Sequence, residues 1–107
     1  MNTGMINTLL LSPMSAKQTL QLTHFIHQGI RGEKKLQRIC CYALEQVFAM
    51  HPLNKKWLDI LFSVSERSFV LKILGKYNHQ IRQANLQTAC YRYLKKINQD
   101  YLALLFL

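Results

Sequence analysis

Residues 36–48, LQRICCYALEQVF, decide the class of fold. Their apolar side chains recur three and four positions apart, a spacing that puts them on one face of an α-helix for more than three turns. They are Leu36, Ile39, Cys40, Ala43, Leu44, Val47 and Phe48. Because a proline interrupts a helix, Pro52 marks the end of this element, and we expect the helix to run from about 33 to 51.

The segment before it has the same helical spacing and a start signal. Ser15 followed three residues later by Gln18 is a capping box, and the serine–proline pair at 12–13 offers a competing start. Gly29 is typical of a helix stop. We therefore expect a helix from about 14 to 28. Its buried side is Leu20, Leu22, Phe25 and Ile26.

Three more helices are predicted downstream. Asn54 is placed to cap a short third helix, and Ser65 is placed to cap a fourth helix that Gly75 closes. Their apolar faces are Trp57, Leu58, Leu61 and Phe62, then Phe69, Val70, Ile73 and Leu74. The last helix begins near Asn78 and continues unbroken. Its inward row is Ile81, Ala84, Leu86, Cys90, Tyr93, Leu94, Ile97, Tyr101 and Leu104.

Length and composition agree with a packed helical protein. The chain has 107 residues, half of them hydrophobic, with only four glycines and two prolines. A chain of this length makes one small domain with a core of its own. We predict an all-α fold, a compact bundle of four to five helices forming a single domain over 1–107. The expected core is Leu36, Ile39, Cys40, Ala43, Leu44, Val47, Trp57, Leu61, Phe69, Ile73, Cys90, Leu94 and Ile97.

The charge balance indicates the kind of partner. Fourteen Lys and Arg against five Asp and Glu give a formal net charge of +9. Residues 1–53 carry +3 and residues 54–107 carry +6, so the positive charge is concentrated in the second half. A field of this size attracts anions, and the alternative is that the charge serves solubility alone.

One row of cations lies in ACYRYLKKINQ, residues 89–99. Because the apolar residues of this segment point inward, Arg92, Lys95 and Lys96 share the outward face. Tyr93 is expected in the core with its hydroxyl at the edge. Tyr91 lies at the boundary, where it is either a packing residue or a platform for an unpaired base.

A second row lies in GEKKLQRIC, residues 32–40. Lys34, Lys35 and Arg38 fall at helical spacing, and like charges so placed destabilise an isolated helix by a few tenths of a kcal/mol. Neither Glu33 nor Glu45 is positioned to offset all three. The row is therefore either a solvated face or a contact for an anion.

Elsewhere the sequence neutralises its cations. Asp59 follows Lys56 and Lys55 by three and four residues, and Asp100 follows Lys96 by four. The sequence contains no motif for base-specific recognition of a nucleic acid, so contact with the nucleic-acid backbone is the expected mode of binding. The candidate nucleic-acid-binding residues are Lys34, Lys35, Arg38, Arg82, Tyr91, Arg92, Lys95 and Lys96.

Catalytic and metal-binding patterns are weak. No two of the five carboxylates share a helical face as a paired acid and base would, so we expect no enzymatic activity, no small-molecule substrate and no cofactor. His24 and His27 are three residues apart, but zinc takes three or four ligands and nothing else matches their spacing. We expect no metal site.

Three cysteines, two of them adjacent at Cys40 and Cys41, suit reduced thiols better than disulfides. No apolar segment reaches the roughly 18 residues that a membrane span requires. The first residues lack a basic region typical of a secretory signal. We expect a cytoplasmic protein with no membrane partner.

A short, basic, wholly helical chain with two rows of cations resembles the small subunit of CRISPR effector complexes of the Cascade type. The resemblance is one of profile over the whole chain, with residues 32–48 and 89–99 as the basic amphipathic helices. It implies a ribonucleoprotein partner, several copies along the complex, and stabilisation of the target or displaced strand in antiviral defence. The apolar run YLALLFL, residues 101–107, either packs internally or joins copies.

Two other classes stay open. One is a small interaction module, a regulator or inhibitor that binds a larger acidic protein. The other is a peripheral membrane protein that uses Trp57 with Lys55 and Lys56, although the apolar side of that helix is needed for the core.

Overall fold

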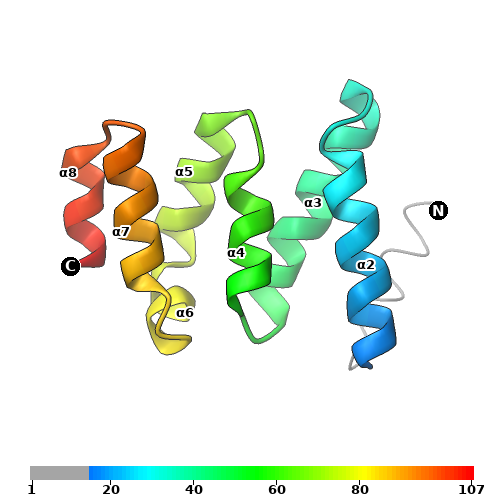
Figure 1. Cartoon of the computed structure of the whole chain (residues 1–107), viewed down its shortest axis with the longest axis horizontal. Helices are drawn as coiled ribbons and strands as arrows, with labels where there is room; N and C mark the ends of the chain where they lie inside the picture. Colours follow the sequence, from blue (N-terminus) through cyan, green and yellow to red (C-terminus); the bar gives the residue numbers. More distant parts are fainter. Residues whose placement is uncertain (1–14) are drawn as a thin grey trace. The chain divides into compact units, whose positions relative to one another are not determined.

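The structure is a computed structural model and describes residues 15–107. Within that range every regular element is helical, with seven α-helices and one 3₁₀-helix and no strand (Figure 1). The all-α class is confirmed, while the number of helices exceeds the four to five expected. Contacts divide the chain into two compact units, Met1–His51 and Pro52–Leu107, and each is described by itself.

Unit 1 contains helices α2 (Ala16–Gly29) and α3 (Lys34–Met50). The predicted capping box is confirmed at the start of α2. The Gln18 amide donates to Ser15 Oγ at 3.2 Å, and the Ser15 amide donates to Gln18 Oε1 at 3.0 Å. The competing start at 12–13 lies outside the described residues.

Helices α2 and α3 pack closely near the turn that joins them. Gly29 is buried, and a Cβ atom built on it would lie 2.1 Å from Cys40 Sγ. That thiol also approaches the Phe25 carbonyl oxygen at 3.9 Å. Gly29 is thus the last residue of α2 rather than a stop, and its missing side chain makes room for the sulfur.

The buried face of α3 follows the sequence pattern. Cys40, Ala43, Leu44, Val47 and Phe48 are buried, while Leu36 and Ile39 are half-buried. On α2, Leu22 and Ile26 are buried and Phe25 is half-buried. The expectation for Leu20 is wrong, because its side chain is 59% exposed and lies off the line of Leu22 and Ile26.

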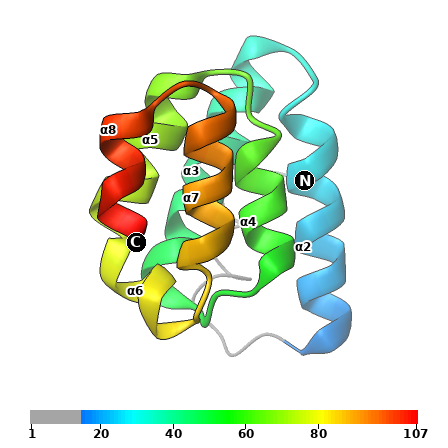
Figure 2. The same ribbon diagram turned by 60° about the vertical axis from the view of Figure 1, so that its left-hand side comes forward.

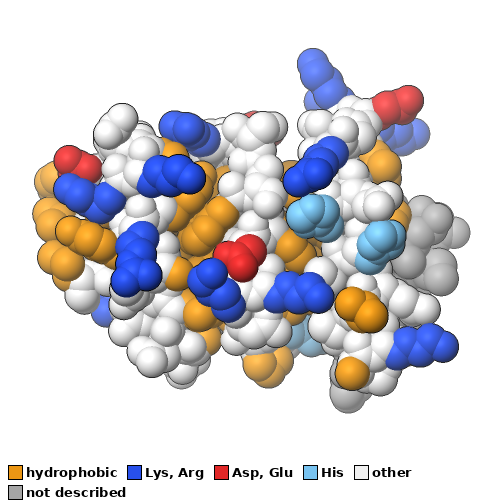
Figure 3. Space-filling model, in the orientation of Figure 1, with side chains coloured by type: hydrophobic (Ala, Val, Ile, Leu, Met, Phe, Trp, Pro, Cys, Tyr) orange, Lys and Arg blue, Asp and Glu red, His pale blue; other side chains and the backbone are white. Residues whose placement is uncertain are grey.

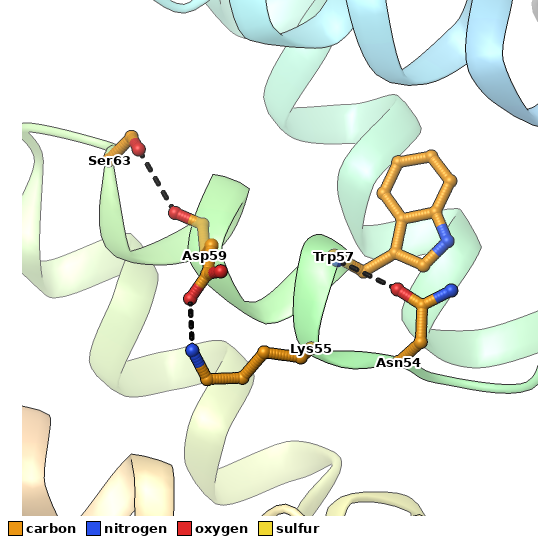
Figure 4. Close-up of polar contacts among 5 residues, drawn as sticks. All are labelled: Asn54, Lys55, Trp57, Asp59 and Ser63. Atoms are coloured by element: carbon orange, nitrogen blue, oxygen red, sulfur yellow. Dashed lines mark hydrogen bonds and ion pairs between the residues drawn. The ribbon is translucent and has the colours of Figure 1, made fainter.

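Unit 2 begins with α4 (Lys55–Phe62), whose start is capped as expected. The Trp57 amide donates to Asn54 Oδ1 at 3.2 Å, and Lys55 Nζ lies 3.0 Å from Asp59 Oδ1 (Figure 4). At the other end Ser63 Oγ donates to the Asp59 carbonyl oxygen at 3.0 Å. The side chains of its two capping residues, Asn54 and Ser63, therefore form hydrogen bonds at both ends of this short helix.

Helix α5 (Arg67–Lys76) differs from the prediction at both ends. Its N-cap is Glu66 without a side-chain cap bond, so Ser65 does not cap it. Gly75 does not close it, because the helix continues to Lys76 and the glycine φ is not positive.

The predicted last helix is in fact three, α6 (Asn78–Gln83), α7 (Gln87–Lys96) and α8 (Asp100–Ala103), followed by η1 (Leu104–Phe106). Asn85 and Asn98 interrupt it with φ of 59° and 62°. Each sits just beyond a helix end in a Schellman motif, which asparagine tolerates because it enters the left-handed region readily.

The hydrogen bonds of both motifs are complete. After α6, the amides of Asn85 and Leu86 donate to the Arg82 and Ile81 carbonyls, each at 3.0 Å. After α7, the amides of Asn98 and Gln99 donate to the Lys95 and Leu94 carbonyls at 3.1 and 2.8 Å. The helical register is lost at each break.

The break at Asn98 changes which side chains face the core. Tyr101 and Leu104, expected on the inward row, are 86% and 57% exposed, while Ala103 and Phe106 are buried. The C-terminal run therefore packs internally through part of its residues only.

Within unit 2, α7 packs on α8 and η1, and α6 contacts α5 and η1. Figure 2 shows α7 beside α4, and the two helices touch through the rings of Phe62 and Tyr93. The buried residues of this unit are Trp57, Leu58, Ile60, Leu61, Val64, Val70, Ile73, Leu74, Tyr77, Ile81, Cys90, Leu94, Ala103 and Phe106. Along the described residues, no helix combines the length and apolarity needed to cross a membrane.

Candidate nucleic-acid interface

A surface groove of about 650 Å³ lies in unit 2 between the end of α4, the start of α5 and the last turns of α7. We call it the α4–α7 groove. Its lining residues are Phe62, Ser63, Val64, Ser65, Arg67, Arg92, Tyr93, Lys96 and Ile97. They comprise three cations, two hydroxyls and an apolar set, so the groove combines positive charge with hydrophobic surface. Figure 3 shows Lys and Arg side chains over α7 and hydrophobic side chains exposed between α7 and α4.

An aromatic pair forms part of the lining. The rings of Phe62 and Tyr93 stack with centroids 4.1 Å apart and planes 5° from parallel. Burial raises the pKa of the Tyr93 hydroxyl, and the nearby Arg67 guanidinium partly opposes that rise. Tyr93 therefore stays neutral near pH 7 and its hydroxyl remains a hydrogen-bond donor beside Arg67.

The groove cations come from two helices. Arg92 and Lys96 are one turn apart on α7, where residues at i and i+4 are neighbours, and Arg67 opens α5. Among the described residues, no carboxylate forms an ion pair with any of the three. The groove is consequently a place where an anion would gain several charge-assisted contacts.

The acids of unit 2 are engaged elsewhere. Asp59 pairs with Lys55, as expected. The pairing of Asp100 with Lys96 is wrong, since Asp100 Oδ1 instead lies 3.3 Å from Lys95 Nζ. The reversal at Asn98 removes the i, i+4 relation that a continuous helix would have given. The change leaves Lys96 without a carboxylate and gives one to Lys95.

The predicted outward face of α7 is exposed as expected. Arg92, Lys95 and Lys96 are all exposed, and Tyr91 and Tyr93 are both half-buried. The structure brings Arg92 and Lys96 together in the groove with Tyr93, whereas Tyr91 and Lys95 lie outside its lining.

Arg82 has a different environment. Its Nη2 donates to the main-chain oxygen of Leu105 and its Nη1 lies 3.4 Å from that of Leu107. The Asn78 Oδ1 accepts from Arg82 Nε at 3.1 Å. The guanidinium thus satisfies carbonyls at the end of η1, and this use competes with any contact to a phosphate.

Lys34, Lys35 and Arg38 lie on the first turns of α3 in unit 1, and all three are exposed. No carboxylate among the described residues pairs with them. A cation near a helix N-terminus is opposed by the helix dipole, and α3 has no acidic residue in its first turn. We call these three residues the α3 cation row.

Arg67 is the groove cation that sequence reasoning missed. It stands alone between Glu66 and Ser68, away from either row of cations, so no charge pattern marks it. Only the approach of the α5 start to α7 joins it with Arg92 and Lys96. The sequence feature that could have indicated it is a cation at the start of a predicted helix, where the helix dipole disfavours positive charge.

The thiols and histidines form no second site. Cys40, Cys41 and Cys90 form no disulfide. Burial, with a smaller contribution from Cys41, raises the pKa of the Cys40 thiol to about 11, and burial raises the pKa of the Cys90 thiol to about 12. Across residues 15–107, no group of three or more His, Cys, Asp or Glu is arranged to hold a metal ion.

The described residues are all helical, and one groove of unit 2 brings three cations together with an apolar lining. No family model matches the chain, and no curated protein or solved structure is significantly similar to it.

Proposed function

We propose that this protein is a non-catalytic nucleic-acid-binding protein that contacts the phosphate backbone through the α4–α7 groove. One observation carries the proposal, namely that Arg67, Arg92 and Lys96 converge on one groove without a carboxylate partner. Regularly spaced phosphates are the ligand for which such a row of cations is suited.

The mode of contact follows from the residue types. Two guanidinium groups can each take two phosphate oxygens, and Lys96 adds a point charge. The hydroxyls of Ser65 and Tyr93 can donate to phosphate oxygens as well. None of these contacts depends on base identity, so binding is sequence-tolerant. The α3 cation row of unit 1 supplies a second, independent set of phosphate contacts.

Salt dependence is the experiment that tests this proposal. Binding of a labelled oligonucleotide is measured by fluorescence anisotropy between about 50 and 200 mM salt. The variant with Arg67, Arg92 and Lys96 all changed to Gln is compared with wild type. We expect the log–log slope to become shallower by about 2 to 3 units, since each of the three lost phosphate contacts changes it by about 0.7 to 0.9.

The matched control is Lys56→Gln. Lys56 is an exposed cation of the same unit, outside the groove and without an ion pair in the described part of the chain. Its loss should leave the slope within error of wild type. Equal effects of the control and a single groove variant such as Arg92→Gln would show that net charge, not the groove, attracts the nucleic acid.

We further propose, on the resemblance of profile described above, that the protein is a small subunit of a CRISPR effector complex, in several copies beside a ribonucleoprotein. Purification from the native host at low salt, followed by identification of the co-purifying chains, tests this placement. Effector subunits and guide RNA are the expected companions. Their absence, with other proteins recovered instead, would remove the placement and leave the binding proposal to the salt experiment.

A second candidate is a small interaction module, a regulator or inhibitor that binds a larger acidic protein, here through an apolar contact surface. The observation in its favour is the exposed apolar set at the C-terminal end, comprising Tyr101, Leu104, Leu105 and Leu107. Large contiguous apolar patches are typical of protein contact surfaces. A partner held by this surface should stay bound as salt is raised, which separates this function from phosphate binding.

A further inference from the structure

We propose that the α4–α7 groove takes an unpaired nucleotide, with the phosphate at its cations and the base against its apolar lining, so that the protein selects single-stranded over duplex nucleic acid. This inference rests on the proposed function and names its substrate class. It assigns a role to Phe62, Tyr93 and Arg67, none of which the cation rows of the sequence include.

The composition of the groove carries the first step. A site for phosphate alone needs only cations and hydroxyls, yet four lining residues are apolar or aromatic, namely Phe62, Val64, Tyr93 and Ile97. They are not all sealed in the core, since Phe62, Tyr93 and Ile97 are half-buried. A ligand with a hydrophobic part next to its charge fits this lining.

Size carries the second step. The volume of about 650 Å³ falls within the roughly 300–1,000 Å³ of sites that enclose small organic groups. One nucleotide joins a flat apolar base to a phosphate, which matches the apolar lining and the three cations together. A duplex keeps its bases stacked inside, so it can offer the groove only its phosphates.

The aromatic geometry carries the third step. Phe62 and Tyr93 are already held nearly parallel, with ring centroids 4.1 Å apart. Each ring covers one face of the other, so a base stacks on an outer face of the pair. Because the pair is formed by α4 and α7 themselves, it is ordered before a ligand arrives. A preformed aromatic platform beside cations is the usual design for sequence-tolerant binding of unpaired strands.

The experiment measures how wild-type protein at fixed low salt binds four ligands, of which the three strand ligands are matched in length. They are a single strand, the same strand in a duplex, the same strand with abasic sites, and a nucleoside monophosphate. The abasic strand keeps its phosphates and lacks bases. We expect the intact strand to bind about tenfold more tightly than the abasic strand and the duplex, and the monophosphate to bind far more weakly.

Two variants identify the groove as the origin of that preference. Tyr93→Leu keeps an apolar side chain and removes the ring, so the difference between intact and abasic strands should shrink toward unity with the salt slope unchanged. Arg92→Gln should do the reverse, with a slope shallower by about 0.7 and the preference for the intact strand retained. Tyr101→Leu, at an exposed tyrosine of unit 2 outside the groove, is the matched control and should behave like wild type.

Photocrosslinking gives a readout that needs no variant. A single strand carrying a photoreactive base should crosslink within the groove lining, with the adduct mapped by mass spectrometry to Tyr93 or Phe62. Adducts only at Tyr91 or only in unit 1 would overturn the inference.

The remaining outcomes separate the two proposals. Equal affinity for the intact strand, the abasic strand and the duplex, with a steep salt slope, overturns the single-strand inference and leaves backbone binding standing. A monophosphate that binds as tightly as the strand overturns it in favour of a nucleotide site. The absence of salt-dependent binding to any strand refutes the proposed function itself.

Discussion

Gly29 shows at the scale of one residue how tightly unit 1 is packed. Its Cα faces the Cys40 sulfur so closely that a methyl group would lie 2.1 Å from Sγ. Glycine is otherwise a poor helix residue, costing about 1 kcal/mol relative to alanine. Its presence within α2 is therefore explained by space and not by backbone conformation, because its φ is not positive.

We predict that Gly29→Ala lowers the free energy of unfolding by about 1–3 kcal/mol, the usual cost of overpacking. In urea denaturation, the double variant Gly29→Ala with Cys40→Ala should be more stable than the sum of the two single changes by at least about 0.5 kcal/mol. A stabilised Gly29→Ala protein would mean that α2 and α3 are farther apart than described.

Asn98 is a second single residue with a large structural consequence. It holds φ at 62° beyond the end of α7, where glycine is the residue of least strain. We predict that Asn98→Ala costs about 1 kcal/mol, while Asn98→Gly changes stability by less than about 0.5 kcal/mol. Chemical denaturation of the two variants checks this, and an alanine variant as stable as the glycine one would favour the continuous helix expected from sequence.

At the scale of one element, the α3 cation row lowers the stability of its helix while it favours binding of an oligonucleotide. Lys34 and Lys35 occupy the first two positions of α3, where the helix dipole disfavours positive charge. We predict that Lys35→Glu raises the free energy of unfolding by about 0.3–1 kcal/mol and weakens oligonucleotide affinity at low salt. Denaturation and anisotropy on the same protein measure both effects.

Lys56→Glu is the matched control, because Lys56 is also the second residue of its helix, α4. It should gain stability too, by a smaller amount because Asp59 follows three residues later, while binding stays unchanged. Lys35→Glu with wild-type affinity would make the α3 cation row a solvated face.

At the scale of the whole molecule, we predict that the buried thiols lower the free energy of unfolding at high pH. Folding raises the pKa of Cys40 to about 11 and of Cys90 to about 12, from 9.0. Below pH 9 the thiols are neutral in both states and their contribution to stability is complete. As pH rises from 9 toward 11 or 12, ionisation favours the unfolded chain, by up to about 1.4 kcal/mol per pH unit for each thiol.

The test follows the free energy of unfolding between pH 8 and about 11 in wild type and in Cys90→Ala. The variant is expected to be less stable at pH 8 through lost packing, yet its stability should fall less steeply above pH 9. Lysine and tyrosine ionisation is common to both proteins and cancels in the comparison. Parallel curves would show that the Cys90 thiol ionises alike in folded and unfolded chains.

Much of this protein follows from local sequence alone. The spacing of Leu44, Val47 and their neighbours requires one buried helical face, and the caps at Ser15 and Asn54 depend on contacts three residues away. Apolar periodicity and capping are local, so a single sequence contains them. The exposure of Arg92 and Lys96 follows in the same way, because the opposite face of their helix is apolar.

Tertiary structure decided the rest. Asn85 and Asn98 carry no stronger turn signal than other asparagines, yet both adopt the left-handed region and redirect the chain. The break at Asn98 exposes the Tyr101 side chain and lets Asp100 form its ion pair with Lys95. Arg67 meets Arg92 and Lys96 only because the start of α5 approaches α7. Such contacts depend on where separate helices pack. Burial of apolar surface sets that packing and brings together residues that are distant in the sequence.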